Sequence, residues 1–241
     1  MSDTTTFRES VRDMRGITVA IERRALLWMA PRLPSWVSSD HLTLLAAAAM
    51  VLGGVAYATS ATMPAALWIV SLLLVVNWFG DSLDGTLARV RQQPRPRYGF
   101  YVDHVVDAAG AGALLAGLGW SGLMSPLVAC GLAAAYFLVA IETYLATYCV
   151  GRFTMSAGGI GGTELRLLLI AINAGAYVMG PRAGLLDPIG LGAIVLLVLT
   201  FAAAAIRHTQ QLFRDEPLPP RALRPGTPSR LAAEGHRPAR V

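Results

Sequence analysis

The chain has 241 residues, of which 54% are hydrophobic and only 15% are charged. Soluble domains carry about a quarter charged residues, so this composition excludes an ordinary soluble protein and predicts a helical membrane protein. The net charge of +5 comes from arginine, since lysine is absent, and most arginines cluster outside the apolar runs. Such arginines are typical of cytoplasmic loops that face anionic lipid, so we expect no nucleic-acid partner.

The N-terminal segment 1–40 is predicted to lie in the cytoplasm and to contain one helix at the membrane surface. Residues 17–30 mix apolar side chains with Glu22 and two arginines, which is typical of an interfacial helix. Two prolines then break the chain, and Asp40 or one of the two serines before it can cap the next helix.

Six apolar runs follow within 41–208, each close to the ~20 residues that cross the hydrocarbon core. They are expected at 41–60, 65–83, 98–120, 126–149, 163–181 and 187–208. The arginine-rich connection 89–97 and both chain ends would face the cytoplasm. The predicted fold class is therefore all-α, with a six-helix transmembrane catalytic domain. The remaining segment, 209–241, is rich in arginine and proline and is expected to be a disordered tail.

Four aspartates lie at the cytoplasmic ends of the second and third runs. Asp81 and Asp84 share one helix face because they are three residues apart, and Asp103 and Asp107 share another because they are four apart. Carboxylates at membrane depth are costly and mark functional sites. Two such faces brought together would form an all-oxygen site suited to Mg²⁺ or Mn²⁺. A pair of such ions could neutralise a bound diphosphate.

Small residues and one arginine accompany the aspartates. Gly85 and Ala88 leave room for a nucleotide to approach the first helix, and Gly99 does the same one turn before Asp103. Arg89 carries a planar guanidinium that can contact a diphosphate. These residues predict a nucleotide diphosphate site beside the cation site.

The combined pattern D-x-x-D-G-x-x-A-R, then G-x-x-x-D-x-x-x-D, resembles the signature of the CDP-alcohol phosphotransferase family, also called the CDP-alcohol phosphatidyltransferase family. All eight signature positions are present: Asp81, Asp84, Gly85, Ala88, Arg89, Gly99, Asp103 and Asp107. The spacer between the half-motifs has nine residues where eight is commoner, and the stretch 39–43 keeps only the threonine of the usual Pro-Asn-x-x-Thr. The helical layout extends the resemblance over roughly 17–208.

The resemblance implies an enzyme of phospholipid biosynthesis that transfers a substituted phosphate group from a CDP-alcohol to an acceptor hydroxyl and releases CMP. The first three aspartates would hold two Mg²⁺ or Mn²⁺ ions, and Asp107 would be a further ligand or the base that deprotonates the acceptor. The glycines, Ala88 and Arg89 would border the CDP moiety. The resemblance also implies a lipid as one substrate, a homodimer in the cell membrane, and an active site that faces the cytoplasm.

Three short matches resemble the choline and ethanolamine phosphotransferase branch of the family. They are Asp103-His104, Glu142-Thr143-Tyr144 and Thr163-Glu164. His104 and Glu164 are therefore further candidates for the base or for acceptor binding. Members of this branch are usually longer, so an enzyme that uses CDP-diacylglycerol, like the phosphatidylglycerol- or phosphatidylinositol-type synthases, stays open. The donor is thus either CDP-diacylglycerol or a CDP-aminoalcohol.

Helix capping and two different classes of membrane protein are the alternatives to this enzyme. Glu164 has two equal explanations, a preference for a helix N-terminus and a role at the acceptor site. Helix capping does not account for the spacing of the four aspartates. An intramembrane prenyltransferase also binds a diphosphate through aspartates, but its two motifs lie far apart. A divalent-metal transporter could use the aspartates for permeation, but they lie at one membrane edge and no internal repeat is visible. Metal-dependent CMP release would distinguish the enzyme from the transporter.

Overall fold

The computed structural model describes residues 11–12, 19–150, 152–153 and 161–218. The elements are β1 (Val11–Arg12), α1 (Val19–Met29), the 3₁₀ helix η1 (Ala30–Arg32), α2 (Ser39–Thr59), α3 (Ala66–Val90), α4 (Pro96–Trp120), α5 (Pro126–Val150), β2 (Arg152–Phe153), α6 (Gly162–Met179) and α7 (Asp187–Asp215). Among the described residues, the β structure is limited to the short parallel pairing of β1 with β2. The predicted all-α class is confirmed.

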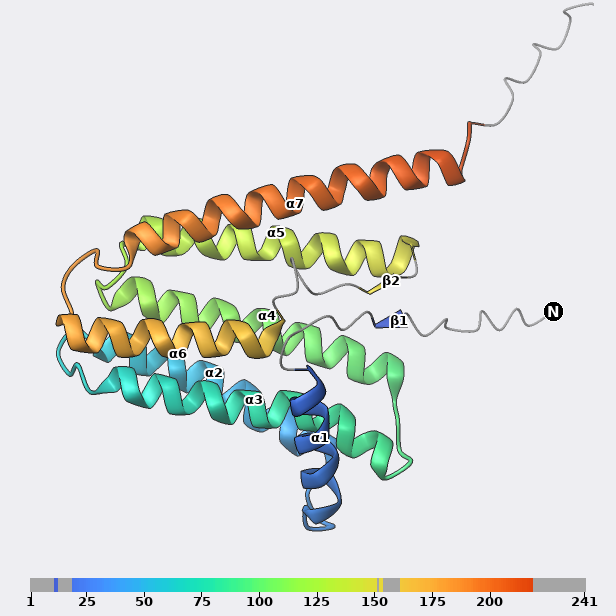
Figure 1. Ribbon diagram of the computed structural model, residues 1–241, viewed down its shortest axis with the longest axis horizontal. Coiled ribbons are helices and arrows are strands. Elements are labelled where there is room, and N and C mark those ends of the chain that lie inside the picture. The colour runs from blue at the N-terminus through green and yellow to red at the C-terminus, as the bar shows by residue number, and fades with distance from the viewer. Residues whose placement is uncertain (1–10, 13–18, 151, 154–160, 219–241) are drawn as a thin grey trace, which may run out of the picture.

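Each predicted apolar run forms a helix, from α2 to α7, and α1 lies across the long helices (Figure 1). The observed helix ends differ from the predicted ones where no proline ends the helix. Helix α3 continues through the aspartate motif to Val90, and the next proline is Pro94. Helix α7 continues to Asp215, just before Pro217, so residues 209–215 are helical rather than part of a tail. Residues 219–241 of the predicted tail lie outside the described residues.

Four of the described helices, α2, α3, α5 and α7, are long and apolar enough to cross a membrane. Helices α4 and α6 have similar lengths, but polar groups dilute their apolar character. These groups include Asp103 and Asp107 in α4, and Glu164 and Arg166 in α6. Length and composition therefore establish four candidate spans, and the six-span layout remains a prediction.

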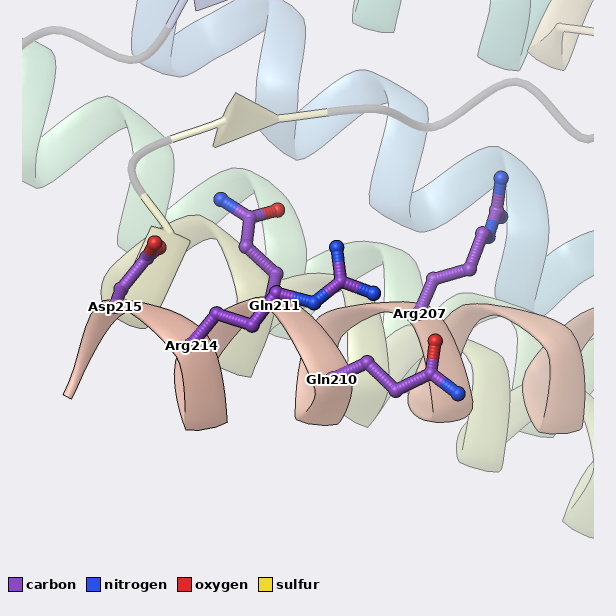
Figure 2. A pocket seen from close by; sticks show the side chains of 5 residues that line it. All are labelled: Arg207, Gln210, Gln211, Arg214 and Asp215. Carbon is purple, nitrogen blue, oxygen red and sulfur yellow. The ribbon is translucent and has the colours of Figure 1, made fainter. Parts of the chain in front are cut away.

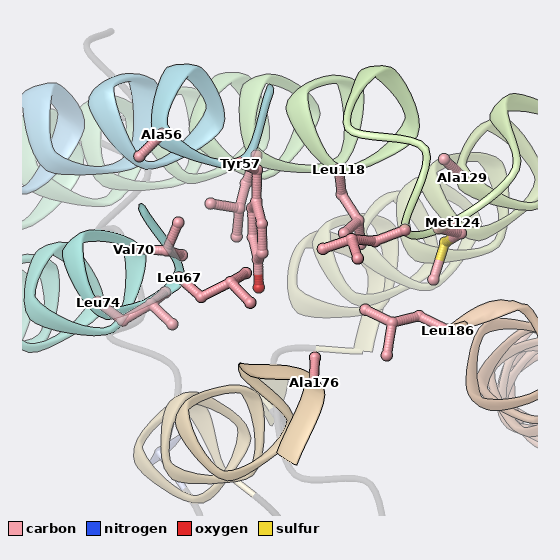
Figure 3. Packing of buried hydrophobic residues seen from close by; sticks show 12 residues of the cluster. Ala56, Tyr57, Leu67, Val70, Leu74, Leu118, Met124, Ala129, Ala176 and Leu186 are labelled. Carbon is pink, nitrogen blue, oxygen red and sulfur yellow. The ribbon is translucent and has the colours of Figure 1, made fainter. Parts of the chain in front are cut away.

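Two apolar clusters pack the bundle. The larger one joins the second half of α2, the first half of α3, the end of α4, the start of α5 and the end of α6 (Figure 3). Tyr57 lies within it and donates a hydrogen bond to Asn173 Oδ1 at 2.7 Å. The smaller cluster packs α1 against α2 and α3 through Leu26, Leu42 and Leu83. Helix α3 belongs to both clusters, so packed neighbours hold the end of α3 that carries Asp81 and Asp84.

Glycines let α2 approach both α3 and α4 closely. A Cβ added at Gly117 of α4 would lie 1.9 Å from the carbonyl oxygen of Gly54, and one added at Gly80 of α3 would lie 2.5 Å from that of Leu42. Only glycine permits such backbone contact between helices. Because α3 and α4 both pack against α2 and are joined by a short connection, their aspartates come together.

Candidate metal and nucleotide site

Asp81 of α3 and Asp103 and Asp107 of α4 form one group of carboxylates. One oxygen from each side chain can be chosen so that all three lie within 4.8 Å of one another. Oxygens that ligate one Mg²⁺ or Ca²⁺ at about 2.0–2.6 Å must lie this close together. A set of carboxylate donors suits a hard divalent cation. The residues present therefore fit the predicted cation site.

Asp84 lies outside this group. Its Oδ2 accepts a hydrogen bond from Thr43 Oγ1 at 2.6 Å, and its backbone oxygen accepts one from Ser39 Oγ at 3.0 Å. Helix α2 thus holds the turn of α3 that carries the aspartates. Thr43 is the threonine that remains of the motif usual before the first span, so the sequence already contained a signal for this contact. The role of Asp84 as a metal ligand stays a prediction.

Arg166 of α6 reaches the carboxylate group from a third helix. Its Nη2 donates to Asp81 Oδ2 at 2.6 Å, and its Nε donates to Asn77 Oδ1 at 2.8 Å. Asn77 in turn donates to the backbone oxygen of Ala46 at 3.1 Å. The sequence does not single out Arg166 as a site residue, although a charged residue within an apolar run is a signal for one.

Glu22 of α1 fastens the surface helix to the site. Its Oε1 accepts hydrogen bonds from Trp78 Nε1 at 2.9 Å and from Ser82 Oγ at 2.8 Å, and its Oε2 accepts one from Thr163 Oγ1 at 2.9 Å. Ser82 follows the first aspartate directly, and Thr163 lies in the first turn of α6. A single carboxylate therefore joins α1, α3 and α6 beside the carboxylate group.

The residues predicted to border CDP have space around them. A Cβ added at Gly99 would meet nothing within 4 Å, and one added at Gly85 would make only ordinary contact with Arg89, at 3.5 Å from Nη1. Arg89 is exposed and donates to Thr86 Oγ1 at 3.2 Å, while Ala88 is half-buried. Packing does not explain these two glycines, so the space beside them is consistent with close approach of a ligand.

His104 and Glu164, the further candidates for the base, both have local partners. His104 is buried, and its Nδ1 lies 2.6 Å from the backbone oxygen of Phe100. A carbonyl oxygen only accepts, so Nδ1 carries the proton. The same Nδ1 lies 3.7 Å from Asp103 Oδ2. Glu164 Oε2 accepts a hydrogen bond from the backbone N–H of Gly161 at 3.0 Å, as expected at a helix N-terminus. Neither arrangement tests a catalytic role.

Two arginines of the α3–α4 connection bind the chain that precedes α2. Arg91 donates to the backbone oxygen of Pro34 at 2.9 Å, and Arg95 pairs with Asp40. The cap of α2 is Ser38, whose Oγ accepts from the backbone N–H of His41 at 3.2 Å. These contacts hold the connection against the N-terminal end of α2.

A separate open hollow lies along the last turns of α7 (Figure 2). It is lined by Arg207, Gln210, Gln211, Arg214 and Asp215. None of these is a predicted site residue, and a single helix supplies all five. The hollow is therefore a polar surface of α7, distinct from the carboxylate group between α3 and α4.

Apolar helices around a partly buried carboxylate group define an integral membrane protein with a candidate divalent-cation site. The model of the CDP-alcohol phosphatidyltransferase family matches residues 36–208, and the chain belongs to this family. It is also similar to the phosphatidylinositol phosphate synthase of Mycolicibacterium smegmatis, with 31% identity over 146 residues. That match covers 58% of this chain and 62% of the relative, which is less than two thirds of its length.

Membership of this family confirms the prediction from the signature. The family consists of phosphotransferase enzymes, and the similar protein is named as a synthase of a phospholipid. This argues against the prenyltransferase and the metal transporter. The choice of donor, the acceptor and the dependence on a metal stay predictions.

Proposed function

We propose that this protein transfers a phosphatidyl group from CDP-diacylglycerol to a hydroxyl of a polar alcohol and releases CMP. The observation that carries the proposal is the grouping of Asp81, Asp103 and Asp107 within the family signature. The name of the similar synthase supports CDP-diacylglycerol over a CDP-aminoalcohol, because its product is a phosphatidyl lipid. The same name makes an inositol phosphate the first acceptor to test.

The residues at the site divide into two sets in this proposal. Asp81, Asp84 and Asp103 would hold two Mg²⁺ or Mn²⁺ ions, and Asp107 would be a further ligand or the base. When bound, such ions neutralise a diphosphate and favour departure of the leaving group. Arg89 is exposed and can donate hydrogen bonds to the diphosphate of CDP, while Gly85, Ala88 and Gly99 would border the nucleotide.

Asp107 is the proposed base. It would take the proton of the acceptor hydroxyl, because an alcohol is a poor nucleophile until that proton leaves. The acceptor oxygen then bonds to the phosphorus that carries diacylglycerol, and the bond from this phosphorus to the oxygen of CMP breaks. CMP leaves with the electron pair of that bond. His104 and Glu164 are the alternative bases, and each already has a partner in the chain, at 2.6 and 3.0 Å respectively.

We further propose that α2 to α7 all cross the cell membrane, with the carboxylate group and both termini on the cytoplasmic side. The arginines of the α3–α4 connection support this orientation, since such residues favour cytoplasmic loops. Helix α1 would lie on the membrane surface, where Ile21 (76% exposed) and Trp28 (60% exposed) can contact lipid. The active form would be a homodimer, as the family resemblance implies.

The pairing of donor and acceptor can be tested with the purified protein in lipid nanodiscs. CMP release is measured with CDP-diacylglycerol plus inositol phosphate, inositol or glycerol phosphate, and with CDP-choline or CDP-ethanolamine plus diacylglycerol. We expect CMP release only in the pairs whose donor is CDP-diacylglycerol. Release with only a CDP-aminoalcohol would overturn the proposed donor. A folded protein that binds no CDP and releases no CMP from any pair would overturn the function.

A further inference from the structure

Tyr144 of α5 has a buried hydroxyl without a hydrogen-bond partner among the residues that the structure describes. Burying a hydroxyl in this way costs stability, so such groups are rare and call for an explanation. The buried Tyr57 shows the usual arrangement, because its hydroxyl donates to Asn173 Oδ1 at 2.7 Å. The phenol of Tyr144 therefore differs from a tyrosine that serves packing alone.

The surroundings of Tyr144 place it beside the carboxylate group. Its ring meets that of His104 edge-on, with 4.8 Å between the ring centroids and 79° between the planes. Its phenol is also close enough to Asp107 and Asp103 to interact electrostatically with both. Asp107 is the proposed base, and Asp103 lies one turn before it on α4. Tyr144 thus lies on the side of the proposed base.

We propose that Tyr144 Oη donates a hydrogen bond to an oxygen of the acceptor alcohol and so orients its hydroxyl toward Asp107. The inference rests on the proposed function, in which the acceptor must come to Asp107 to lose its proton. A phenol beside carboxylates is a neutral donor that can bind an alcohol or alkoxide oxygen without adding charge. Binding of the acceptor would give the buried hydroxyl its partner. In this arrangement Tyr144 contacts the acceptor and does not contact the nucleotide.

Tyr144→Phe tests this inference because it removes one oxygen atom and keeps the ring against His104. Tyr148→Phe is the matched control, since Tyr148 lies one turn further along α5 and is 90% exposed. Steady-state CMP release is measured with CDP-diacylglycerol, with inositol phosphate as the acceptor probe, and thermal unfolding is followed in the same preparations. For Tyr144→Phe we expect kcat/KM for the acceptor to fall by at least about tenfold. The KM for CDP-diacylglycerol should not change, and the unfolding midpoint should not fall, because the removed hydroxyl has no partner among the described residues. Tyr148→Phe should match the wild type.

Three outcomes would overturn the inference. Wild-type constants for both substrates in Tyr144→Phe would show that the hydroxyl touches neither. A change confined to the KM of the donor would place it at the nucleotide. A lower unfolding midpoint with unchanged kinetics would show a structural hydrogen bond. An inert wild type with every substrate pair is a different result, because it overturns the proposed function and the inference together.

Discussion

Arg166 and Asp81 form an ion pair at 2.6 Å at the edge of the carboxylate group, with side chains that are 17% and 22% exposed. The Nε of the same guanidinium donates to Asn77 Oδ1 at 2.8 Å, so two nitrogens fix the side chain of Arg166. Charged groups at membrane depth are stabilised by such partners. The pair also orients Asp81 toward the two aspartates of α4. The guanidinium of Arg166 thus lies next to Asp81 of the candidate metal site.

Replacing Arg166 by lysine should impair catalysis. A lysine keeps the charge but lacks the planar fork that binds Asn77 and Asp81 at once. We expect CMP release by Arg166→Lys to fall about tenfold, with the protein still folded. Arg182→Lys, in the exposed connection between α6 and α7, is the matched control and should leave the rate unchanged. A wild-type rate in Arg166→Lys would show that the geometry of the pair does not matter.

Two glycines of α3 and α4 should respond in opposite ways to the same change. In Gly80→Ala the new Cβ would lie 2.5 Å from the carbonyl oxygen of Leu42, so the backbone must move. The free energy of unfolding should therefore fall by about 1–3 kcal/mol. In Gly99→Ala the Cβ meets nothing within 4 Å, so stability should hold while CDP binding weakens. Thermal unfolding and calorimetric titration with CDP measure the two effects. Unchanged CDP binding in Gly99→Ala would remove this residue from the nucleotide edge.

Much of the fold could be predicted from local sequence patterns. Apolar runs of sufficient length mark the six helices α2 to α7, and the spacing of the aspartates places each pair on one helix face. The grouping of Asp81 with Asp103 and Asp107 follows because α3 and α4 are neighbours along the chain. The ends of α3 and α7 were less predictable, because a helix continues through polar residues until a proline or an unfavourable turn stops it.

The contacts that complete the site depend on helix crossings that local patterns do not contain. Arg166 and Asp81 are 85 positions apart in sequence, and Thr43 and Asp84 are 41 apart. The pairing of Thr43 with Asp84 depends on the close approach of α2 and α3, which Gly80 permits. Charge and polarity within apolar segments show that such residues need partners, but the partners become visible only in the folded chain.

Loss of the Glu22 carboxylate should loosen α1. In Glu22→Gln one acceptor oxygen becomes an amide nitrogen, so at least one of Trp78, Ser82 and Thr163 loses its acceptor. We expect the free energy of unfolding to fall by about 1–3 kcal/mol, measured by denaturation in detergent. Glu216→Gln makes the same chemical change at an exposed position and should have little effect. Equal stability of the two variants would mean that the Glu22 contacts contribute nothing.

Each carboxylate of the group should be needed for activity. Asn replaces Asp at nearly constant volume but removes the negative charge that a divalent cation requires. We expect Asp81→Asn, Asp103→Asn and Asp107→Asn each to lower CMP release at least about a hundredfold. Asp215→Asn, at the exposed end of α7, is the control and should retain the wild-type rate. Full activity in any of the three variants would remove that residue from the catalytic group.

The decisive measurement is CMP release from CDP-diacylglycerol by the wild-type protein and by Asp103→Asn, before and after removal of divalent cations with EDTA. We predict that EDTA stops release by the wild type, that Mg²⁺ or Mn²⁺ restores it, and that Asp103→Asn remains inactive throughout while still folded. Release that continues in EDTA, or a rate in Asp103→Asn equal to that of the wild type, would contradict a metal-dependent phosphotransfer centre at these carboxylates.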